Sequence, residues 1–450
     1  MFNLKEKKVV VMGLGLHGGG VGVAIWAAKH GAKVLVTDMK SRAELKDSLL
    51  QLKKFKNIQY RLGKHVDKDF QNVDIVVANP IVRKDNKYLK IARKNGALIY
   101  NDVSLFMDLC PCRVIGITGT KGKSTTSALL YHLVKNKNVY LGGNIRISPF
   151  TFLDKLKKND WVILEMSSWQ CEGLSSIKKS PHISVLTNLG IDHLNTYKSF
   201  AEYAKAKALV FKYQDKNDYA VLNKQDDYTK KLIKNIKAKK SYFNIKGKSG
   251  NYFLNNYIYY NNTKLISADN IKLIGLHNIT NILTVLEVCS ILKLSAVKVK
   301  KGLASFKGLS GRMEFVKNIK GVKYINDTTA TAPIAAISSI NSLDRPIILI
   351  AGGNDKKLDI ENFASTIINK IVSVILLPGT ATDKLVSIFK KKKFVDYILV
   401  NSMPEAVKTA KDKARYGDIV LLSPGATSFG SFVNEFDRGD QFIKAVKKLK

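Results

Sequence analysis

Short apolar runs that end in glycine or another turn residue recur along this chain and restrict its fold more than any other feature. Clear examples are Lys8–Met12 before Gly13, Arg113–Thr118, Pro346–Ile350 and Ile419–Leu422. Helix-like segments separate such runs, an alternation that is typical of parallel, doubly wound sheets. Loops at the carboxyl edge of an open sheet carry small and turn residues, as these loops do. We therefore expect an α/β fold.

The runs fall into three blocks, which agrees with about three domains for a chain of 450 residues. We expect a Rossmann-like domain over residues 1–101, a central P-loop ATPase-like domain over 102–308 and a second Rossmann-like domain over 309–450. Residues 241–275 are rich in Tyr, Asn and Thr with short alternation, and they predict a small antiparallel sheet within the central block.

The composition limits the kinds of molecule that we expect this protein to bind. Hydrophobic residues make up 45% of the chain and charged residues 24%, which is ordinary for a globular protein. The formal net charge of +38 invites a nucleic-acid interpretation, but the lysines are scattered along the whole sequence instead of forming one stripe. We therefore expect an attraction for anionic substrates and no nucleic-acid partner.

The sequence also bears on location. Residues 1–8 lack the apolar core of a secretion signal, and no apolar stretch approaches the roughly 18 residues that suggest a membrane span. The cysteines are Cys110, Cys112, Cys171 and Cys289, and no second close pair completes a zinc spacing. We expect a soluble cytoplasmic monomer with reduced cysteines and no membrane partner.

Residues 115–126 read I-G-I-T-G-T-K-G-K-S-T-T and are typical of a phosphate-binding loop. The common form has a glycine five places before the glycine of Gly-Lys-Ser, where this chain has Ile117. Backbone N–H groups from Gly119 to Lys123, at the start of a helix, would form a nest for an anion. Lys123 would meet the β and γ phosphates of a nucleotide, and the Ser124 hydroxyl would bind Mg²⁺.

An earlier turn, G-L-G-L-H-G, follows the first strand, and Asp38 lies twenty residues beyond Gly18. Strand, glycine-rich turn, helix and a later acid match the dinucleotide fingerprint. NAD is one interpretation, another nucleotide-bearing molecule is a second, and a tight turn without a ligand is a third. Two phosphate-binding turns in one chain suggest two different nucleotide-containing ligands.

Three further side chains stand near strand ends or follow them. Glu165 ends the apolar run Trp161–Leu164, where a carboxylate beside the nucleotide loop is placed to hold Mg²⁺. His193 follows another strand end, although a lone histidine is more often a surface or core residue. Taken alone, Lys207 would be interpreted as a residue on the exposed surface of a helix.

Eight segments make a more specific pattern. In chain order they are G-T-K-G-K-S-T-T, E-M-S-S-W-Q, D-H-L-N-T-Y, Y-A-K-A-K-A, G-L-H-N-I-T-N, G-R-M-E-F-V, N-D-T-T-A-T and S-P-G-A-T-S-F. The series resembles the Mur ligase family of peptidoglycan synthesis, from Gly13 to about Phe442. The family uses this shorter glycine spacing in its ATP loop.

The resemblance implies a reaction. ATP would convert a substrate carboxylate to an acyl phosphate, and the amine of an amino acid would then attack it. G-L-G-L near the start, with N-D-T-T-A-T and S-P-G-A-T-S-F, most resembles the family member that adds D-glutamate to UDP-N-acetylmuramoyl-L-alanine. Three domains would hold three substrates, and we expect the third block to rotate about residues 307–311 when ATP binds.

The resemblance also implies binding residues for each substrate. The UDP-sugar contacts would be Leu16, His17, Asp38, Met39 and Asn144. The ATP contacts would be Gly119, Thr120, Lys121, Gly122, Lys123, Ser124, Thr125, Asn278, Arg312 and Asp327. The D-glutamate contacts would be Thr331, Lys356, Ser428 and Phe429.

Two Mg²⁺ ions are implied in the same way. Ser124 and Glu165 would hold the first, and His193 and Lys207 the second. In the family this lysine is carbamylated, which turns a cation into a carboxylate-like metal ligand. Lys123, Glu165, His193 and Lys207 would thus form the catalytic set.

Several positions depart from the family pattern. His17 stands where a small hydroxyl residue is common, and Thr329 stands where some members carry a lysine. Lys356 would supply that charge. Either Glu435 or Phe436 would take an aromatic substrate contact.

Other functions fit fewer of these features. Folylpolyglutamate synthases begin close to their ATP loop, and the L-alanine-adding ligase has a histidine where this loop has Lys121. A basic P-loop protein that binds nucleic acid would leave Lys207 and Ser428 without a use. An NAD oxidoreductase would leave the second loop unexplained. A Mur-type ligase for a different amino acid remains the principal alternative.

Overall fold

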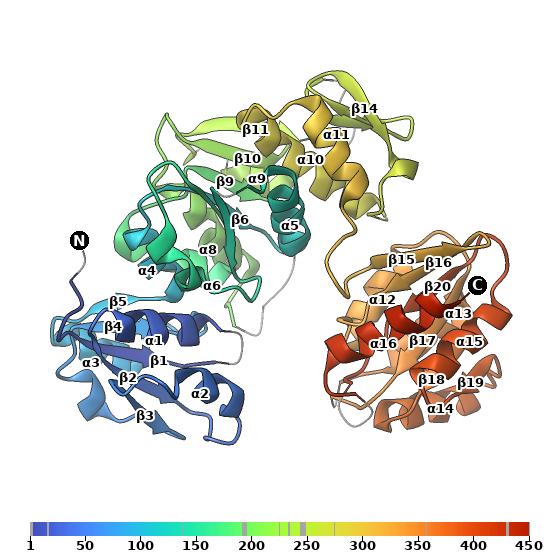
Figure 1. Cartoon of the computed structure of the whole chain (residues 1–450), viewed down its shortest axis with the longest axis horizontal. Coiled ribbons are helices and arrows are strands. Elements are labelled where there is room, and N and C mark those ends of the chain that lie inside the picture. Colours follow the sequence, from blue (N-terminus) through green and yellow to red (C-terminus); the bar gives the residue numbers. More distant parts are fainter. Residues whose placement is uncertain are drawn as a thin grey trace. The chain divides into compact units, whose positions relative to one another are not determined.

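The computed structural model describes most of the chain. The described residues are 3–15, 18–136, 138–190, 196–224, 226–232, 235–243, 249–273, 275–356, 358–428 and 432–449. The chain divides into two compact units (Figure 1). The first contains Met1–Ile266 and Thr280–Val299, and the second contains Ser267–Ile279 and Lys300–Lys450.

The first unit begins with a five-stranded parallel sheet in the order β3-β2-β1-β4-β5. Its strands are β1 (Lys8–Met12), β2 (Lys33–Asp38), β3 (Ile58–Leu62), β4 (Ile75–Ala78) and β5 (Leu98–Tyr100). The accompanying helices are α1 (Gly19–Lys29), α2 (Lys46–Leu52), α3 (Lys87–Lys94) and α4 (Asp102–Leu109), with the 3₁₀ turn η1 (Asp67–Phe70). The strand order reverses between β1 and β4, and such switch points are where open sheets bind ligands.

A second parallel sheet of the same unit has the order β11-β10-β9-β6-β8-β7. Its strands are β6 (Arg113–Thr118), β7 (Val139–Gly143), β8 (Trp161–Glu165), β9 (Ile183–Leu186), β10 (Tyr219–Asn223) and β11 (Lys239–Phe243). Its helices are α5 (Lys123–Val134), α6 (Ser168–Glu172), α7 (Leu174–Ile177), α8 (Phe200–Lys212) and α9 (Asp227–Leu232), with η2 (Pro149–Thr151) and η3 (Leu153–Lys155). Every strand run that the sequence analysis placed here is a strand in the structure.

A three-stranded sheet follows, as the Tyr-, Asn- and Thr-rich segment predicts. It comprises β12 (Tyr252–Leu254), β13 (Tyr257–Tyr260) and β14 (Thr263–Ser267). β12 and β13 are antiparallel, which confirms the predicted pairing direction. The turn η5 (Ala268–Asn270) and the helices α10 (Leu276–Ile291) and α11 (Ala296–Ser305) come next in the chain.

The second unit contains a six-stranded sheet in the order β15-β16-β20-β17-β18-β19. Its strands are β15 (Glu314–Ile319), β16 (Val322–Asn326), β17 (Ile347–Gly352), β18 (Ile371–Leu377), β19 (Tyr397–Leu399) and β20 (Ile419–Leu422). All neighbours are parallel except the hairpin β15–β16. Lys320 and Gly321, both with positive φ, make the two-residue turn of that hairpin.

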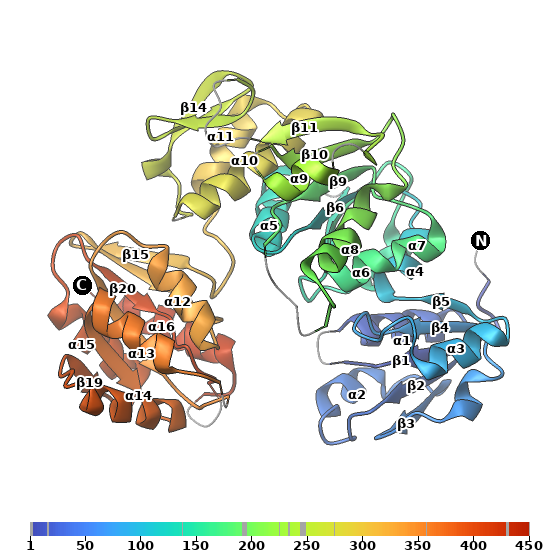
Figure 2. The same ribbon diagram turned by 180° about the vertical axis from the view of Figure 1, so that it is seen from behind.

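Helices cover both faces of this sheet (Figure 2). They are α12 (Pro333–Asn341), α13 (Glu361–Lys370), α14 (Thr380–Lys391), α15 (Met403–Lys413) and α16 (Glu435–Lys448). Leu349 and Leu421 face the core formed with α12 to α14, whereas Ile350 and Leu422 face the core formed with α15 and α16. Continuous apolar strands are therefore required, because successive side chains enter opposite cores.

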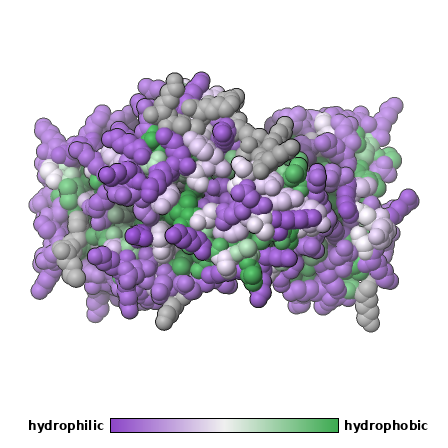
Figure 3. Space-filling view, turned by 90° about the horizontal axis from the view of Figure 1, so that it is seen from above, coloured by the Kyte–Doolittle hydropathy of each residue, from purple (hydrophilic) through white to green (hydrophobic). Residues whose placement is uncertain are grey.

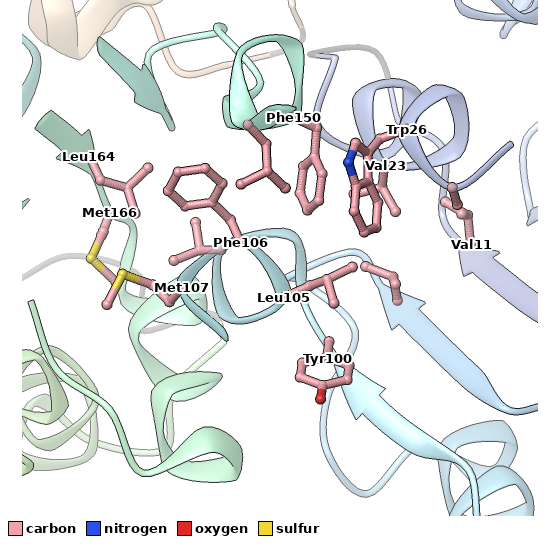
Figure 4. Close-up of a cluster of buried hydrophobic side chains, with 14 of the residues drawn as sticks. Val11, Val23, Trp26, Tyr100, Leu105, Phe106, Met107, Phe150, Leu164 and Met166 are labelled. Carbon is pink, nitrogen blue, oxygen red and sulfur yellow. The ribbon is translucent and has the colours of Figure 1, made fainter. Parts of the chain in front are cut away.

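The first two sheets share one hydrophobic core, part of which is shown in Figure 4. Trp26 of α1 lies against Phe150, with ring centroids 5.3 Å apart, and Phe106 of α4 contacts the same ring at 6.2 Å. Leu164 and Met166, at the end of β8, belong to the same cluster. This packing explains why the two sheets form one compact unit.

Hydrophilic residues cover most of the face in Figure 3, and hydrophobic residues form small groups among them. This agrees with lysines that are spread along the sequence. Among the described residues, no helix is both long and apolar enough to cross a bilayer.

Candidate functional site

The first glycine-rich turn lies at the carboxyl end of β1 and leads into α1. A Cβ on Gly13 would lie 2.8 Å from the Asn79 Cβ, and one on Gly20 would lie 2.5 Å from the Leu14 oxygen. Gly13 and Gly15 also have positive φ, at 84° and 67°. Glycine is therefore needed both for the backbone conformation and for the close approach of β4 to the turn.

Asp38, predicted to contact the UDP-sugar, supports this turn from β2. One carboxylate oxygen accepts a hydrogen bond from the Gly15 N–H at 3.3 Å, and the other accepts one from the Lys40 N–H at 2.9 Å. The neighbouring Met39 side chain is 64% exposed. Leu16 and His17, predicted to be contacts as well, lie outside the described residues.

A cavity of about 380 Å³ opens beside the turn, within the first unit. Its lining combines the glycine-rich turn with segments that follow β4, β7 and β8. Among the lining residues are Gly15, Gly20, Asn79, Asn144, Arg146 and Gln170. Asn144, a predicted UDP-sugar contact, thus lies beside the first turn, whereas Asp38 and Met39 are not among the residues that line this cavity.

The second loop lies between β6 and α5 and is held by the end of β9. The Thr120 and Lys121 N–H groups donate to the Asn188 carbonyl and side-chain oxygens, at 2.9 and 3.0 Å. The Thr187 hydroxyl donates to the Lys121 carbonyl at 2.7 Å. A Cβ on Gly119 would lie 1.9 Å from the Thr187 hydroxyl oxygen, so this loop position requires glycine.

Lys123 is the first residue of α5, and its side chain extends back over the phosphate-binding loop. Its ammonium donates to the Gly119 and Thr120 carbonyl oxygens at 3.0 and 3.1 Å. Ser124 and Thr125 follow in the first turn of the helix. A positive charge above a loop at a helix N-terminus is the arrangement expected for binding nucleotide phosphates.

Sequence reasoning missed Asn281, which contacts the same loop from α10. A Cβ on Gly122 would lie 2.2 Å from the Asn281 side-chain oxygen, and the Thr126 hydroxyl lies 3.5 Å from that oxygen. Asn281 stands one helical turn after the predicted ATP contact Asn278, which is buried on the same helix. The second asparagine of G-L-H-N-I-T-N was the signal that could have revealed it.

Glu165 ends β8 directly beside β6, with Glu165 in register with Ile117. Its side chain is 1% exposed. One carboxylate oxygen accepts a hydrogen bond from the Asn144 side-chain amide at 2.9 Å, and the other is buried without a hydrogen-bond partner in the described structure. An unpartnered buried carboxylate oxygen is costly, which makes this position suited to a cation.

The donor set fits Mg²⁺ better than a transition metal. Three or more His, Cys, Asp or Glu side chains do not gather anywhere in the described part of the chain. Mg²⁺ commonly uses one or two protein oxygens together with substrate phosphates and water. Glu165 at the end of β8 offers one such oxygen, and the Ser124 hydroxyl in the first turn of α5 is the other predicted ligand.

Lys207 is buried in α8, with 2% exposure, and does not lie on the helix surface. Its ammonium lies 4.7 Å from the centre of the Tyr203 ring. The Tyr203 hydroxyl donates to the Thr120 hydroxyl at 3.2 Å, which links α8 to the phosphate-binding loop. His193, the predicted partner of Lys207, lies outside the described residues.

In the second unit, Asp327 follows β16, and its carboxylate forms hydrogen bonds with several segments of the chain. One of its carboxylate oxygens accepts hydrogen bonds from the Ser339 and Ser423 hydroxyls at 2.6 and 2.8 Å, and the other accepts one from the Met313 N–H at 3.2 Å. Burial raises the pKa of Asp327 to about 6. Arg312, the other ATP contact predicted here, precedes Met313 and opposes that shift through its charge.

The predicted D-glutamate contacts meet at the carboxyl edge of the same sheet. The Lys356 ammonium donates to the Thr331 hydroxyl at 2.9 Å. Asn354 and Thr427 exchange two backbone hydrogen bonds, each 3.0 Å, which hold the Lys356 loop beside buried Ser428. Phe429 lies outside the described residues.

The departures from the family pattern also have structural roles. The Thr329 hydroxyl donates to the Gly311 carbonyl at 2.8 Å. Asn434 caps α16 by accepting hydrogen bonds from the Phe436 and Asp437 N–H groups. The Phe436 ring is 41% exposed, and the Glu435 carbonyl accepts a hydrogen bond from Thr328 at 2.7 Å.

Arg438 on α16 is a second residue that sequence reasoning missed. It is fully buried, and its guanidinium donates to the Thr328 hydroxyl at 3.1 Å, the Thr328 carbonyl at 2.9 Å and the Ala426 carbonyl at 3.2 Å. Burial lowers its pKa to about 10. Its place one helical turn before buried Phe442, on the apolar face of the helix, was the available signal.

Comparisons with known proteins agree with this arrangement. Residues 7–101 match the Mur ligase MurD-like N-terminal domain, 117–289 the Mur ligase middle domain and 311–425 the Mur ligase glutamate ligase domain. A UDP-N-acetylmuramoylalanine–D-glutamate ligase of Borreliella afzelii is 39% identical over 99% of both chains. The enzyme of that name from Clostridium tetani is 35% identical over 99% of this chain and 97% of its own.

Solved structures share the fold at lower identity. UDP-N-acetylmuramate-alanine ligase MurC from Thermotoga maritima has a TM-score of 0.58 at 20% identity, and covers 99% of this chain and 100% of its own. MurF ligase from the same organism, in complex with ADP, has a TM-score of 0.55 at 17% identity and covers 99% and 96%. With relatives at 35% and 39% identity over nearly its whole length and three domain matches in order, this chain belongs to the Mur ligase family.

Proposed function

We propose that this protein is an ATP-dependent ligase that joins D-glutamate to UDP-N-acetylmuramoyl-L-alanine in peptidoglycan precursor synthesis. The observation that carries the proposal is the match to D-glutamate ligases over 99% of the chain. The geometry agrees, because a phosphate-type loop and a buried, incompletely paired carboxylate lie on neighbouring strands of one sheet. The ATP would be bound by this loop.

The chemical difficulty lies in bringing two anions together. A carboxylate does not react with an amine at neutral pH until its oxygen is converted to a good leaving group, such as phosphate. The substrate carboxylate and the γ-phosphoryl group repel each other by about 4 kcal/mol at 4 Å and an effective dielectric near 20. Lys123 supplies a positive charge at this point and stabilises the charge that develops during phosphoryl transfer.

Ser124 and Glu165 would hold the first Mg²⁺. The ion supplies further positive charge to the phosphate oxygens when it is bound. Asn144 fixes the Glu165 carboxylate through its 2.9 Å hydrogen bond, so the free oxygen keeps its direction. Asn144 also lines the cavity beside the first turn, where we propose that the UDP-sugar binds.

We propose that His193 and a carbamylated Lys207 hold a second Mg²⁺. Support comes from the burial of Lys207, because a lysine side chain is rarely buried to 2% exposure. Lys207→Ala should lose most phosphate release, and short carboxylic acids such as formate should partly restore it. Lys205→Ala, at an exposed position of the same helix, is the matched control. Full activity of Lys207→Ala would remove the carbamate from the mechanism.

D-glutamate carries two carboxylates, and the second unit offers groups that suit them. Lys356 and the Thr331 hydroxyl already lie 2.9 Å apart, and Ser428 is held next to their loop. We propose that these groups, with Phe429, orient D-glutamate so that its amine attacks the acyl phosphate. The tetrahedral intermediate then releases phosphate.

The organisation of the enzyme is part of the proposal. We place the domain boundaries at residues 1–101, 102–308 and 309–450. We also propose that the enzyme works in the cytoplasm, where ATP is available, and that it is a monomer.

The deciding experiment measures phosphate release by purified protein with ATP, Mg²⁺ and UDP-N-acetylmuramoyl-L-alanine across a panel of amino acids. We expect release to depend on D-glutamate. Release that ignores D-glutamate but responds to another amino acid would leave the reaction type intact and overturn the specificity.

A further inference from the structure

Cys110 and Cys112 form a thiol pair that the ligase reaction does not use. They lie where α4 ends and β6 begins, with Pro111 between them. Their sulfur atoms are 3.5 Å apart, close to van der Waals contact. The pair is thus at the amino end of β6, at the opposite end of that strand from the phosphate-binding loop.

The backbone favours this arrangement. Cys110 has φ −64° and ψ 121°, the extended conformation expected of a residue before proline. Alternate side chains of an extended segment point to the same side, so residues two apart face each other. The ring of Pro111 fixes its own φ and removes freedom that the pair would otherwise lose on bond formation. The sulfurs must approach by only about 1.5 Å to reach a disulfide length near 2.05 Å.

Solvent exposure distinguishes this pair from the other two cysteines. Cys110 and Cys112 are partly exposed and Pro111 is exposed, whereas Cys171 and Cys289 are buried in cores. A small reagent in solution can therefore reach the pair in the folded protein, but reaches Cys171 and Cys289 only after opening. Burial also raises the pKa of the Cys171 thiol to about 11 and of Cys289 to about 12, which keeps both unreactive.

The two thiols of the pair differ in acidity. A hydrogen bond from Cys112 lowers the pKa of Cys110, and the charge of Lys179 contributes to the same shift. The same interaction raises the pKa of Cys112. Lys179 is held nearby by Asp108, with its ammonium 2.7 Å from the carboxylate. Cys110 is therefore the more acidic thiol of the pair and the one that more readily attacks as a thiolate.

We propose that Cys110 and Cys112 are a reversible dithiol–disulfide site that reacts with low-molecular-weight disulfides. The Cys110 thiolate attacks one sulfur of a disulfide RSSR, forms a mixed disulfide and releases RS⁻. Cys112 loses its proton and attacks the Cys110 sulfur, which expels the second RS⁻. Two protein thiols are oxidised by two electrons, and one RSSR is reduced to two RSH.

The test uses the full-length protein in glutathione buffers that range from fully reduced to fully oxidised at pH 7. Samples are quenched in acid, unfolded, alkylated and measured by intact mass and peptide mapping. We expect the number of alkylated cysteines to fall from four to two, with an intramolecular link between Cys110 and Cys112. Dithiothreitol should restore all the thiols.

Single variants separate the two steps. Cys112→Ser should accumulate a stable glutathione adduct on Cys110, because the resolving thiol is absent. Cys110→Ser should react several-fold more slowly, because burial and the charge of Asp160 still raise the pKa of the remaining Cys112 thiol. A persistent adduct on the wild-type protein, or four alkylated cysteines at every buffer ratio, would overturn the proposal. These measurements do not involve ligase activity, so they test the thiol pair independently of the proposed function.

Discussion

At the scale of the single residue, Glu165 combines an energetic cost with a chemical use. Burying a charged oxygen without a hydrogen-bond partner costs more than the roughly 1–3 kcal/mol of a neutral group. The chain nevertheless places that oxygen next to a loop shaped for phosphates. Groups that are strained or unpaired in the folded protein are commonly those that a ligand completes.

Glu165→Gln tests this role with a change of charge and almost no change of shape. The amide oxygen can still accept the hydrogen bond from Asn144, so we expect the fold to be retained. Phosphate release should fall by roughly 100-fold or more, the size of effect seen when a group that stabilises transition-state charge is removed. Glu44→Gln, at an exposed position of the same unit, is the control, and equal activities of the two variants would contradict the assignment.

Asp327 permits a prediction about pH. Its folded-state pKa of about 6 exceeds the ordinary 3.8, so the folded protein binds more protons than the unfolded chain between those values. Stability from this group is therefore present below about pH 4 and is lost as the pH rises to about 6. Asp327→Asn removes this titration.

The measurement is the thermal unfolding of wild type and Asp327→Asn at several pH values. Relative to the variant, the free energy of unfolding of the wild type should fall by up to about 3 kcal/mol between pH 3.5 and 7. Only the change with pH counts, because the amide also alters the hydrogen bonds of Ser339 and Ser423. A constant difference across the range would show that the carboxyl group titrates normally.

At the scale of the element, the continuous apolar strands were predictable from the sequence, and the hairpin of β15 and β16 was not. β17 and β20 are continuous apolar runs followed by turn residues, because each must enter two cores. β15 mixes Lys and Asn with apolar residues at mostly half-exposed positions, and β16 is mostly buried but includes Lys323 and Asn326, so the periodicity of both strands is weak. Their pairing depends on the turn at Lys320 and Gly321, which the sequence analysis did not consider.

The helix α16 shows a related difficulty. Its amphipathic pattern is visible in the sequence, but the target of Arg438 lies 110 residues earlier in the chain. A long separation in the chain also hid Asn281, whose contact with Gly122 joins distant segments. Motifs predicted Lys123, Glu165, Asn144 and the Lys356–Thr331 pair, whereas the residues that hold those motifs in place emerged only from the packing.

Arg438→Met tests whether α16 stabilises the second unit from within. The methionine fills the space but leaves the Thr328 and Ala426 carbonyls without their donors. We expect a loss of about 2 kcal/mol in the free energy of unfolding, measured by urea denaturation. Lys444→Met, at an exposed position of the same helix, should change stability little, and an equal loss in both variants would count against the role of Arg438.

At the scale of the whole molecule, the sequence indicated three blocks but not how tightly they associate. The Trp26–Phe150 and Phe106–Phe150 contacts unite the first two sheets in one compact unit. Apolar residues of this kind appear in the sequence as ordinary core positions, and nothing local specifies which sheet they contact. The domain boundaries themselves remain a proposal.

The proposed substrates are assigned to residues of both units, which leads to a prediction about motion. Adding ATP and UDP-N-acetylmuramoyl-L-alanine should change the small-angle scattering curve, because we propose that the block over residues 309–450 rotates about residues 307–311. Lys123→Ala should show a smaller change with the same additions, since it binds the phosphates less well. Identical scattering with and without substrates would contradict this motion.

The burial of Arg438 also has a consequence for biosynthesis. The segments after β16 and β20 are translated before Arg438, so their hydrogen bonds to its guanidinium form only once α16 has been made. A message truncated a few codons before position 438 would yield a polypeptide that keeps all eight motifs but lacks these hydrogen bonds. We expect such a product to be less stable than the intact protein and to be cleaved more readily by proteases.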